Sequence, residues 1–186
     1  KKQSVVVDQD EGPRADTSLE GLAKLKPAFK ADGTVTAGNA SSLNDAASAV
    51  LVMDRGKAEA LGLKPRCTIV SQAVAAVEPK YMGIGPVHAI PMALERAGLQ
   101  LGDMDVIELN EAFAAQSLAV DRELHFDPQK LNPNGGAIAL GHPVGATGAI
   151  VFTKAVHELE RTRGEFALVS LCIGGGQGIA TVIRKS

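Results

Sequence analysis

The alternation of apolar and polar positions divides the chain into an irregular first part and a regular second part. Residues 1–44 contain a short apolar run that predicts a strand at residues 4–8, and the polar sequence after it is broken by Gly and Pro, which predicts irregular structure. In residues 45–61 apolar side chains recur near helical spacing. Asn44 or Asp45 can cap the helix that this spacing predicts.

From about residue 66 onward, apolar runs typical of strands alternate with apolar spacing typical of helices. Such alternation implies a layered α/β domain with helices on the faces of a sheet. A short glycine-rich loop joins the last two strands, so they can pair antiparallel and make the sheet mixed. We predict strands at residues 68–74, 105–109, 166–172 and 179–184, and helices at residues 87–97, 111–124 and 147–161.

Composition argues against several kinds of partner. The 186 residues carry 19 Lys and Arg against 21 Asp and Glu, and only 3% are aromatic, so neither a phosphate-tracking surface nor a base-stacking platform is indicated. No apolar run approaches the roughly 18 residues that a membrane helix needs. Two cysteines make no disulfide framework, which favours a reducing, cytoplasmic setting, and the four histidines show no metal-ligand spacing. We therefore expect no nucleic acid, membrane or metal as a partner.

The most unusual motif surrounds His142. Residues 134–148 read Asn-Gly-Gly-Ala-Ile-Ala-Leu-Gly-His-Pro-Val-Gly-Ala-Thr-Gly, with five glycines and a predicted helix after them. This glycine spacing fits neither a P-loop nor a dinucleotide-binding loop. Two interpretations remain open. The loop holds His142 where backbone and substrate approach closely, or it is a turn into a helix with a structural, hydrogen-bonded histidine.

A cysteine precedes a second glycine-rich loop. Cys172 ends a predicted strand and is followed by Ile-Gly-Gly-Gly-Gln-Gly at residues 173–178. The N–H groups of such a loop can stabilise an oxyanion, and a cysteine beside a histidine can act as a base or nucleophile. The alternative is a buried structural cysteine before a hairpin turn, which is the commoner case for an arbitrary cysteine. Cys67 opens a strand, and the structural interpretation is favoured more strongly there.

Two further segments precede predicted helices. Asn110 follows the strand at residues 105–109, so it can cap the next helix or point into a cleft at the carboxyl end of the strand. Glu111 fits the first turn of that helix, where its charge favours the helix dipole. Residues 36–45, Thr-Ala-Gly-Asn-Ala-Ser-Ser-Leu-Asn-Asp, form either a capping loop or a binding loop for the polar tail of a substrate.

Taken together and in this order, the motifs resemble the thiolase family. The likeness runs from about Arg14 to the end of the chain. The Asn-Ala-Ser loop and the triple glycine are more similar to biosynthetic acetyl-CoA acetyltransferases than to degradative long-chain enzymes. Ser42 and Ala46 depart from the pattern, because the family usually has glycine there. The matching blocks are Gly-Asn-Ala-Ser at residues 38–41, Met-Gly-Ile-Gly-Pro at 82–86, Asn-Glu-Ala-Phe at 110–113, Gly-His-Pro at 141–143 and Cys-Ile-Gly-Gly-Gly at 172–176.

The resemblance implies an activity and assigns roles to particular residues. Thiolases make or break carbon–carbon bonds in coenzyme A thioesters, which they bind as substrates and not as permanent cofactors. His142 would activate a nucleophilic cysteine and later help hold the enolate oxygen of acetyl-CoA, with a water held by Asn110 in the same oxyanion hole. Cys172 would remove the α-proton, and the N–H of Gly174 would help form a second oxyanion hole. The residues implied to contact coenzyme A are Ser41 at the pantetheine arm, Arg14 near the nucleotide, and Phe29, Met82 and Phe113 along the apolar tunnel.

The resemblance also implies that the nucleophile lies outside this sequence. Neither Cys67 nor Cys172 matches the nucleophile motif of the family, and the sequence does not begin with Met. We expect residues 1–65 to be the tail of the loop region and the last helix of the N-terminal thiolase domain, and residues 66–186 to be the C-terminal domain. The implied partners are an N-terminal half with the nucleophile and further copies in an oligomer such as a tetramer.

Three alternatives to a biosynthetic acetyl-CoA acetyltransferase stay open at this point. They are a 3-ketoacyl-CoA thiolase of fatty-acid degradation, a ketosynthase relative that acts on carrier-bound substrates, and a non-catalytic coenzyme A-binding or structural subunit. The Cys172 block favours a thiolase over a ketosynthase, because ketosynthases use no cysteine as a base there. The presence of His142, Cys172 and Asn110 together argues against a lapsed site.

Overall fold

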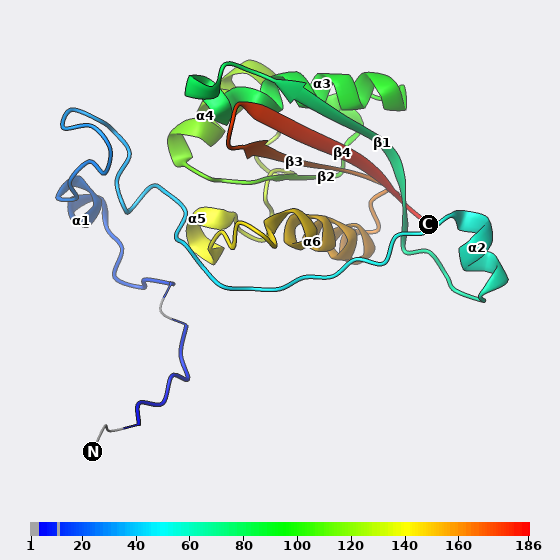
Figure 1. Ribbon diagram of the computed structural model, residues 1–186, viewed down its shortest axis with the longest axis horizontal. Helices are drawn as coiled ribbons and strands as arrows, with labels where there is room; N and C mark the ends of the chain where they lie inside the picture. The colour runs from blue at the N-terminus through cyan, green and yellow to red at the C-terminus, as the bar shows by residue number, and fades with distance from the viewer. Residues whose placement is uncertain (1–3, 11) are drawn as a thin grey trace.

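A four-stranded mixed sheet forms the centre of the computed structural model, which describes residues 4–10 and 12–186 (Figure 1). The strand order is β1-β4-β3-β2. Strand β4 pairs antiparallel with both β1 and β3, whereas β2 pairs parallel with β3. The predicted α/β class and the mixed sheet are therefore confirmed. The strands are β1 (Cys67–Ala76), β2 (Val106–Leu109), β3 (Phe166–Ile173) and β4 (Gln177–Lys185).

Helices cover the sheet on both faces. Helix α3 (Gly85–Ala97) lies over β1, β4 and β3, with α4 (Ala114–Leu124) beside it, and α6 (Thr147–Thr162) lies on the opposite face over β2 and β3 (Figure 1). Helices α3 and α6 each bury one apolar side against the sheet, as a three-layer domain requires, whereas α4 packs against α3 and η1. The remaining helices are short: α1 (Leu19–Ala23), α2 (Arg55–Ala60), η1 (Pro79–Ile84), η2 (Leu101–Asp103) and α5 (Ala137–Leu140).

Side chains of β2 alternate between two cores. Ile107 and Leu109 belong to the core beneath α3, whereas Val106 belongs to the core beneath α6. Because side chains of a strand alternate between its two faces, Glu108 and Asn110 lie on the α6 side with Val106. Each large apolar side chain buried in this way contributes about 1.5–3 kcal/mol to folding.

The helix predicted for residues 45–61 forms only in its last part. The structure has an extended chain through residues 45–54, and α2 begins after Asp54, whose side chain accepts a hydrogen bond from Lys57 N. The helical spacing of the alanines was misleading, because the run Val50-Leu51-Val52 favours extended backbone. Leu51 and Val52 are 79% and 65% exposed, so this part of the chain leaves its apolar side chains uncovered.

The strand predicted at residues 4–8 does not form in the structure. Val5, Val6 and Val7 are all exposed, and the described residues provide no strand that pairs with them. A strand is stable only with a hydrogen-bonded neighbour, so a short apolar run by itself is insufficient. In Figure 1 this segment runs away from the sheet.

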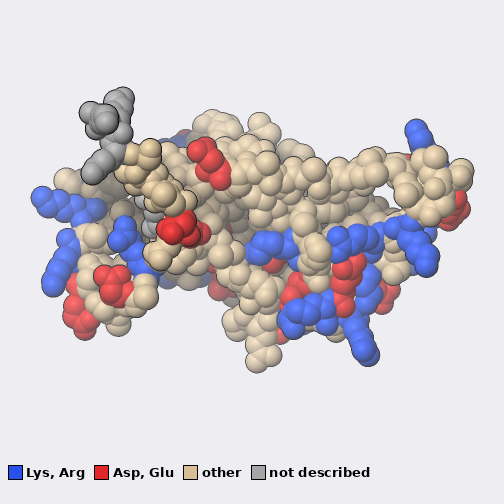
Figure 2. Space-filling model, turned by 90° about the horizontal axis from the view of Figure 1, so that it is seen from below, with Lys and Arg blue, Asp and Glu red and all other residues tan. Residues whose placement is uncertain are grey.

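Positive and negative side chains are interspersed on the face of the molecule seen in Figure 2. Two ion pairs involve α6: Arg66, just before β1, with Glu160 at 2.5 Å, and Arg161 with Glu158 at 2.6 Å. Figure 2 shows no broad patch of a single sign. Within residues 4–10 and 12–186, no helix combines the length and apolar character needed to cross a membrane.

Candidate active site

Two of the sequence motifs reach the same edge of the sheet because β2 and β3 run parallel. Leu109 pairs with Ser170, and the N–H of the next residue, Asn110, donates to Ser170 O at 3.0 Å. Cys172 follows two residues later on β3. The carboxyl ends of parallel strands are where α/β proteins gather their sites, so this edge is the natural place for the chemistry.

Asn110 and His142 are in direct contact at this edge. Asn110 Nδ2 lies 3.3 Å from His142 Nε2, and His142 Nδ1 lies 2.7 Å from Thr147 Oγ1. The Thr147 hydroxyl donates its single proton to Pro143 O at 2.9 Å, so it accepts from His142 Nδ1–H. In the neutral ring, Nε2 then carries a lone pair that accepts from the Asn110 amide.

Burial sets the protonation of the two titratable groups. It lowers the pKa of His142, so the ring is neutral at pH 7 and Nε2 is available as a base. It raises the pKa of the Cys172 thiol, so Cys172 rests as a thiol and is a stronger base once deprotonated. Among the described residues, no hydrogen bond joins Cys172 to His142 or Asn110, so Cys172 shares this edge of the sheet without being hydrogen-bonded to the other two.

The loop at residues 36–45 holds His142 in place. Asn44 Oδ1 accepts a hydrogen bond from His142 N at 3.1 Å, and His142 N also contacts Ser42 O at 3.2 Å. Gly141, with φ of 97°, brings its backbone against the Asn44 side chain where a Cβ would collide. The prediction that Asn44 caps a helix was therefore wrong, because its side chain is occupied by the histidine loop.

The sequence allowed Asn110 to cap a helix with Glu111 in its first turn, but no helix begins at these residues. Helix α4 starts at Ala114 with Phe113 in the capping position. The Glu111 carboxylate instead accepts hydrogen bonds from Ile138 N at 3.2 Å and Asn132 Nδ2 at 3.3 Å. Glu111 therefore connects the Asn110 motif to the His142 motif.

Asn132 also stabilises the end of β2 at this edge of the sheet. Its side chain exchanges two hydrogen bonds of 2.9 Å with the backbone of Leu109, and its N–H donates to Ile107 O at 2.7 Å. This arrangement extends the hydrogen-bonding pattern of β2 up to Asn110. The sequence by itself indicated no role for Asn132, for which only its position beside the glycine motif gave a hint.

The loop after Cys172 is a tight hairpin turn. Gly175 and Gly176 have φ of 93° and 96°, a conformation that glycine adopts without strain. Gly176 packs against the backbone of Val77, whose N–H donates to Gly176 O at 2.8 Å. Gly174 lies exposed at the start of this turn. The loop is therefore fixed at its base and open to solvent at Gly174.

The structure brings together three of the five residues implied to bind coenzyme A. The Ser41 hydroxyl donates to Ala112 O at 3.0 Å, which places it next to Phe113. Phe29 and Phe113 make an edge-to-face contact with ring centres 6.0 Å apart, and Phe29 remains 76% exposed. Met82 is half-buried in η1, which packs near α4. Arg14 is exposed in the segment before α1.

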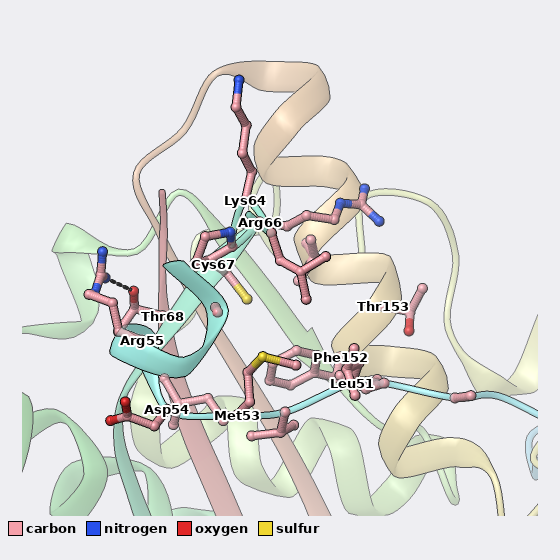
Figure 3. Close-up of a pocket in the computed structure, with 18 residues that line it drawn as sticks. Leu51, Met53, Asp54, Arg55, Lys64, Arg66, Cys67, Thr68, Phe152 and Thr153 are labelled. Atoms are coloured by element: carbon pink, nitrogen blue, oxygen red, sulfur yellow. Dashed lines mark hydrogen bonds between the residues drawn. The ribbon is translucent and has the colours of Figure 1, made fainter. Parts of the chain in front are cut away.

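A hollow of about 610 Å³ lies away from these residues (Figure 3). It is bounded by the extended segment at residues 49–54, by α2, by the start of β1 and by α6. Figure 3 shows Met53, Cys67 and Phe152 among its lining residues, with the Arg55–Thr68 hydrogen bond of 2.6 Å at one side. None of the residues assigned to chemistry lines this hollow, so its size does not make it the active site.

Two family models match the chain. The model described as thiolase, C-terminal domain, matches residues 63–185, and that described as thiolase, N-terminal domain, matches residues 1–56. Among curated relatives, the beta-ketothiolase BktB of Cupriavidus necator is 58% identical over 186 residues. The acetyl-CoA acetyltransferase of Pseudomonas aeruginosa is 57% identical over 185 residues. Each match covers 100% of this chain but 47% of the relative, so the chain spans about half the length of these relatives.

Solved structures agree with these matches. The crystal structure of the Bacillus anthracis acetyl-CoA acetyltransferase superposes with a TM-score of 0.93 at 50% identity, covering 100% of this chain and 47% of that one. The crystal structure of human mitochondrial 3-ketoacyl-CoA thiolase in complex with CoA gives 0.88 at 49% identity, covering 97% and 46%. The resemblance inferred from the motifs is thus confirmed over the whole sequence, and the chain belongs to the thiolase family.

Proposed function

We propose that this chain is the C-terminal half of an acetyl-CoA acetyltransferase that reversibly condenses two acetyl-CoA molecules into acetoacetyl-CoA and free CoA. The observation that carries the proposal is the contact between Asn110 and a neutral His142 at the edge of the sheet. Claisen condensation needs a base and fixed neutral hydrogen-bond donors, and this pair can supply both. The family supplies the reaction class.

In the first half-reaction, His142 Nε2 takes the proton of a cysteine thiol on the N-terminal half. The resulting thiolate attacks the carbonyl carbon of acetyl-CoA, and the negative oxygen of the tetrahedral intermediate is held in part by Gly174 N–H. The intermediate collapses to an acetylated cysteine. The departing CoA thiolate takes the proton of the Cys172 thiol and leaves as CoA, so that Cys172 becomes a thiolate and His142 keeps its proton on Nε2.

In the second half-reaction, deprotonated Cys172 removes the α-proton of another acetyl-CoA. Its buried sulfur suits this task, because burial raises the pKa of the thiol. His142 and a water held by Asn110 stabilise the enolate oxygen. The enolate carbon attacks the carbonyl carbon of the acetylated cysteine, and the cysteine leaves as a thiolate that regains its proton from His142 as acetoacetyl-CoA forms. Loss of one such donor typically costs on the order of 3 kcal/mol in the barrier.

Coenzyme A is a substrate in this proposal, and no permanently bound cofactor is needed. Ser41, Phe29 and Phe113 lie together on one side of the site, which supports a path for the pantetheine arm. Met82 and Arg14 extend the proposed path toward the apolar tunnel and the nucleotide. Because Cys172 has to be a free thiol, the proposal includes a reducing, cytoplasmic setting.

The nucleophile is proposed to come from an N-terminal thiolase half. Cys67 pairs with Lys185 at one end of β4, whereas Cys172 pairs with Gly178 near the other end, so Cys67 is unsuited to the site. The extended segment at residues 45–53 makes no backbone hydrogen bond to a described residue and exposes Leu51 and Val52. Unpaired backbone with exposed apolar side chains is an edge that a neighbouring strand can cover. Further copies would complete an oligomer, such as a tetramer.

Intact mass and subunit composition of the native protein, followed by an assay of acetoacetyl-CoA cleavage by free CoA, test this proposal. We expect an N-terminal thiolase half in the active particle, joined covalently or as a second chain. A longer-chain 3-ketoacyl-CoA should be cleaved less efficiently than acetoacetyl-CoA. A folded but inactive particle that contains both halves would overturn the catalytic proposal.

A further inference from the structure

A buried ion pair lies behind the catalytic residues on the α6 side of the sheet. Glu108 is 1% exposed, and Lys154 Nζ donates to its Oε2 at 2.7 Å. The same ammonium donates to Gly135 O at 2.6 Å, at the start of the glycine motif around His142. Moving a charged side chain from water into the protein interior costs free energy, and pairing it often does no more than offset this cost. A role other than stability therefore has to explain why Glu108 is buried. Nothing in the proposed reaction uses it.

Two acceptor atoms beside this pair have no partner. Glu108 Oε1 and Asn110 Oδ1 are buried, and neither accepts a hydrogen bond from a described residue. Glu108 lies on β2, and Asn110 directly follows β2 and continues its pairing through a hydrogen bond to Ser170 O, so the two side chains lie on the same face and next to one another. Unpaired buried acceptors are rare, because the hydrogen bonds that they made to water in the unfolded chain have been lost.

A small cavity connects the two residues. Its volume is about 30 Å³, and both Glu108 and Asn110 line it, as do Lys154 and Thr147. A cavity needs roughly 10–15 Å³ of such space to hold one water. The Asn110 and Thr147 side chains are also those that contact the two ring nitrogens of His142. The cavity therefore lies directly behind the catalytic pair.

The chemistry of the two unpaired atoms defines the ligand. Both are acceptors, so the ligand must donate twice, and a water molecule does this with its two protons. A metal cation fits poorly, because Lys154 already neutralises the single carboxylate. An apolar occupant would leave both acceptors unpaired.

We propose that this cavity binds a water, separate from the one that Asn110 holds for the enolate oxygen, that donates to Glu108 Oε1 and Asn110 Oδ1, and that Glu108 and Lys154 are positioning residues for the active site. The water fixes the Asn110 amide with Nδ2 toward His142. If the amide turned over, its oxygen would face the lone pair of His142 Nε2, acceptor against acceptor. Burial raises the pKa of Glu108, and the hydrogen bond and charge of Lys154 oppose this effect by favouring the ionised carboxylate, which accepts the proton of the water. The catalytic consequence rests on the proposed function, but the water site does not.

The water site is tested by a crystal structure of the complete enzyme, with both halves, at a resolution that shows ordered water. We expect one density peak within hydrogen-bonding distance of Glu108 Oε1 and Asn110 Oδ1. An empty cavity, or a direct bond from a protonated Glu108 to Asn110, would overturn the proposal. This result stands whether or not the enzyme turns over acetoacetyl-CoA.

The positioning role is tested by kinetics of three variants in the same enzyme. In Glu108→Gln the amide N–H donates to the water, which still donates to Asn110, so kcat should stay within about 3-fold of wild type. Glu108→Met removes the hydrogen-bond acceptor of the water. We expect it to lower kcat about 10- to 100-fold, the loss of rate that a misplaced catalytic group typically causes, and to change KM by no more than about 2-fold. Glu158→Gln is the matched control: Glu158 is also buried, is paired with Arg161 and accepts from Asn134 Nδ2 at 2.8 Å, but it does not line the cavity, and a glutamine oxygen can still accept from Asn134. We expect it to lower Tm without changing kcat.

A double-mutant cycle separates positioning from general destabilisation. If Glu108 acts through Asn110, Glu108→Met should cause no further loss of kcat in an Asn110→Ala background. Independent, additive losses would overturn the positioning role, even with the water present. Equal loss of kcat in Glu108→Met and Glu158→Gln would do the same.

Discussion

Residues 66–186 and residues 4–65 differ in how far their apolar side chains are buried. In the first region apolar residues are packed into two cores on either side of the sheet, and Leu168 and Ile183 are 0% exposed. In the second region Val6, Phe29 and Leu51 are each more than 75% exposed. The C-terminal region thus folds around its own core, whereas most of the N-terminal region has no core of its own.

The exception within the N-terminal region is the loop that reaches the active site. Ser41 and Asn44 are held by hydrogen bonds to Ala112 and His142, both in the C-terminal region. The flanking segment at residues 45–53 has no such contacts in its backbone. The difference indicates that the C-terminal region and the loop at residues 36–45 organise the candidate site together, and it fits the proposal that the remaining N-terminal residues are covered by an N-terminal half.

The largest effect is expected from Cys172→Ala in the complete enzyme. Without the proposed base, thiolysis of acetoacetyl-CoA should fall at least about 10³-fold, within the range for loss of a general base. Cys172 is only partly buried, so Tm should change little. Retention of more than a tenth of the activity would remove Cys172 from the mechanism.

The next largest effect tests whether the exposed extended segment of the N-terminal region binds the other half of the enzyme. Val50→Asp with Val52→Asp places charge on the exposed extended segment, so binding of a separately expressed N-terminal half should weaken at least about 10-fold. The Tm of this chain alone should shift little, since surface substitutions are usually within about 0.5 kcal/mol. Leu61→Asp, at the exposed end of α2, is the control and should leave binding unchanged. Unaltered binding in the double variant would show that the segment does not contact the other half.

A smaller effect is expected from Glu111, which links the two site motifs within the C-terminal region. Glu111→Ala leaves the Ile138 N–H without its acceptor, which typically costs about 1–3 kcal/mol. The denaturation midpoint in urea should fall accordingly, and kcat should decrease more than KM changes, because the His142 loop loses its anchor. A variant with wild-type stability would show that the loop is held by other contacts.

The smallest effect is a pH dependence. Burial lowers the pKa of His142, so the folded chain binds this proton less readily than the unfolded chain does. The contribution is present above the ordinary histidine pKa of about 6.5 and is lost as the pH falls below it. Unfolding midpoints measured at pH 7.5 and 5.5 should therefore differ less in His142→Asn than in wild type. Parallel behaviour of the two proteins would assign the acid sensitivity to other groups.

The sequence predicted the sheet and its helices well because their patterns are local. The alternation after residue 66 identified all four strands, and the glycine loop after Cys172 indicated the antiparallel pair. It failed at residues 4–8 and 45–54, where apolar residues suggested regular structure. Those segments have no partner among the described residues, and neither a strand nor a buried helix side is stable without one.

Residue identity and order therefore determined the family, the fold class and the candidates His142, Asn110 and Cys172. Only the tertiary structure decided which of them meet. In the structure Asn110 contacts His142, and neither Asn110 nor Asn44 caps a helix. Glu111 and Asn132 are hydrogen-bonded to each other and stabilise the loops of the site. The tertiary structure also placed Glu108 and Asn110 around one cavity. The physical reason is that a hydrogen bond needs about 3 Å and a defined direction, and side chains 20–100 residues apart reach that geometry only when the whole sheet is assembled.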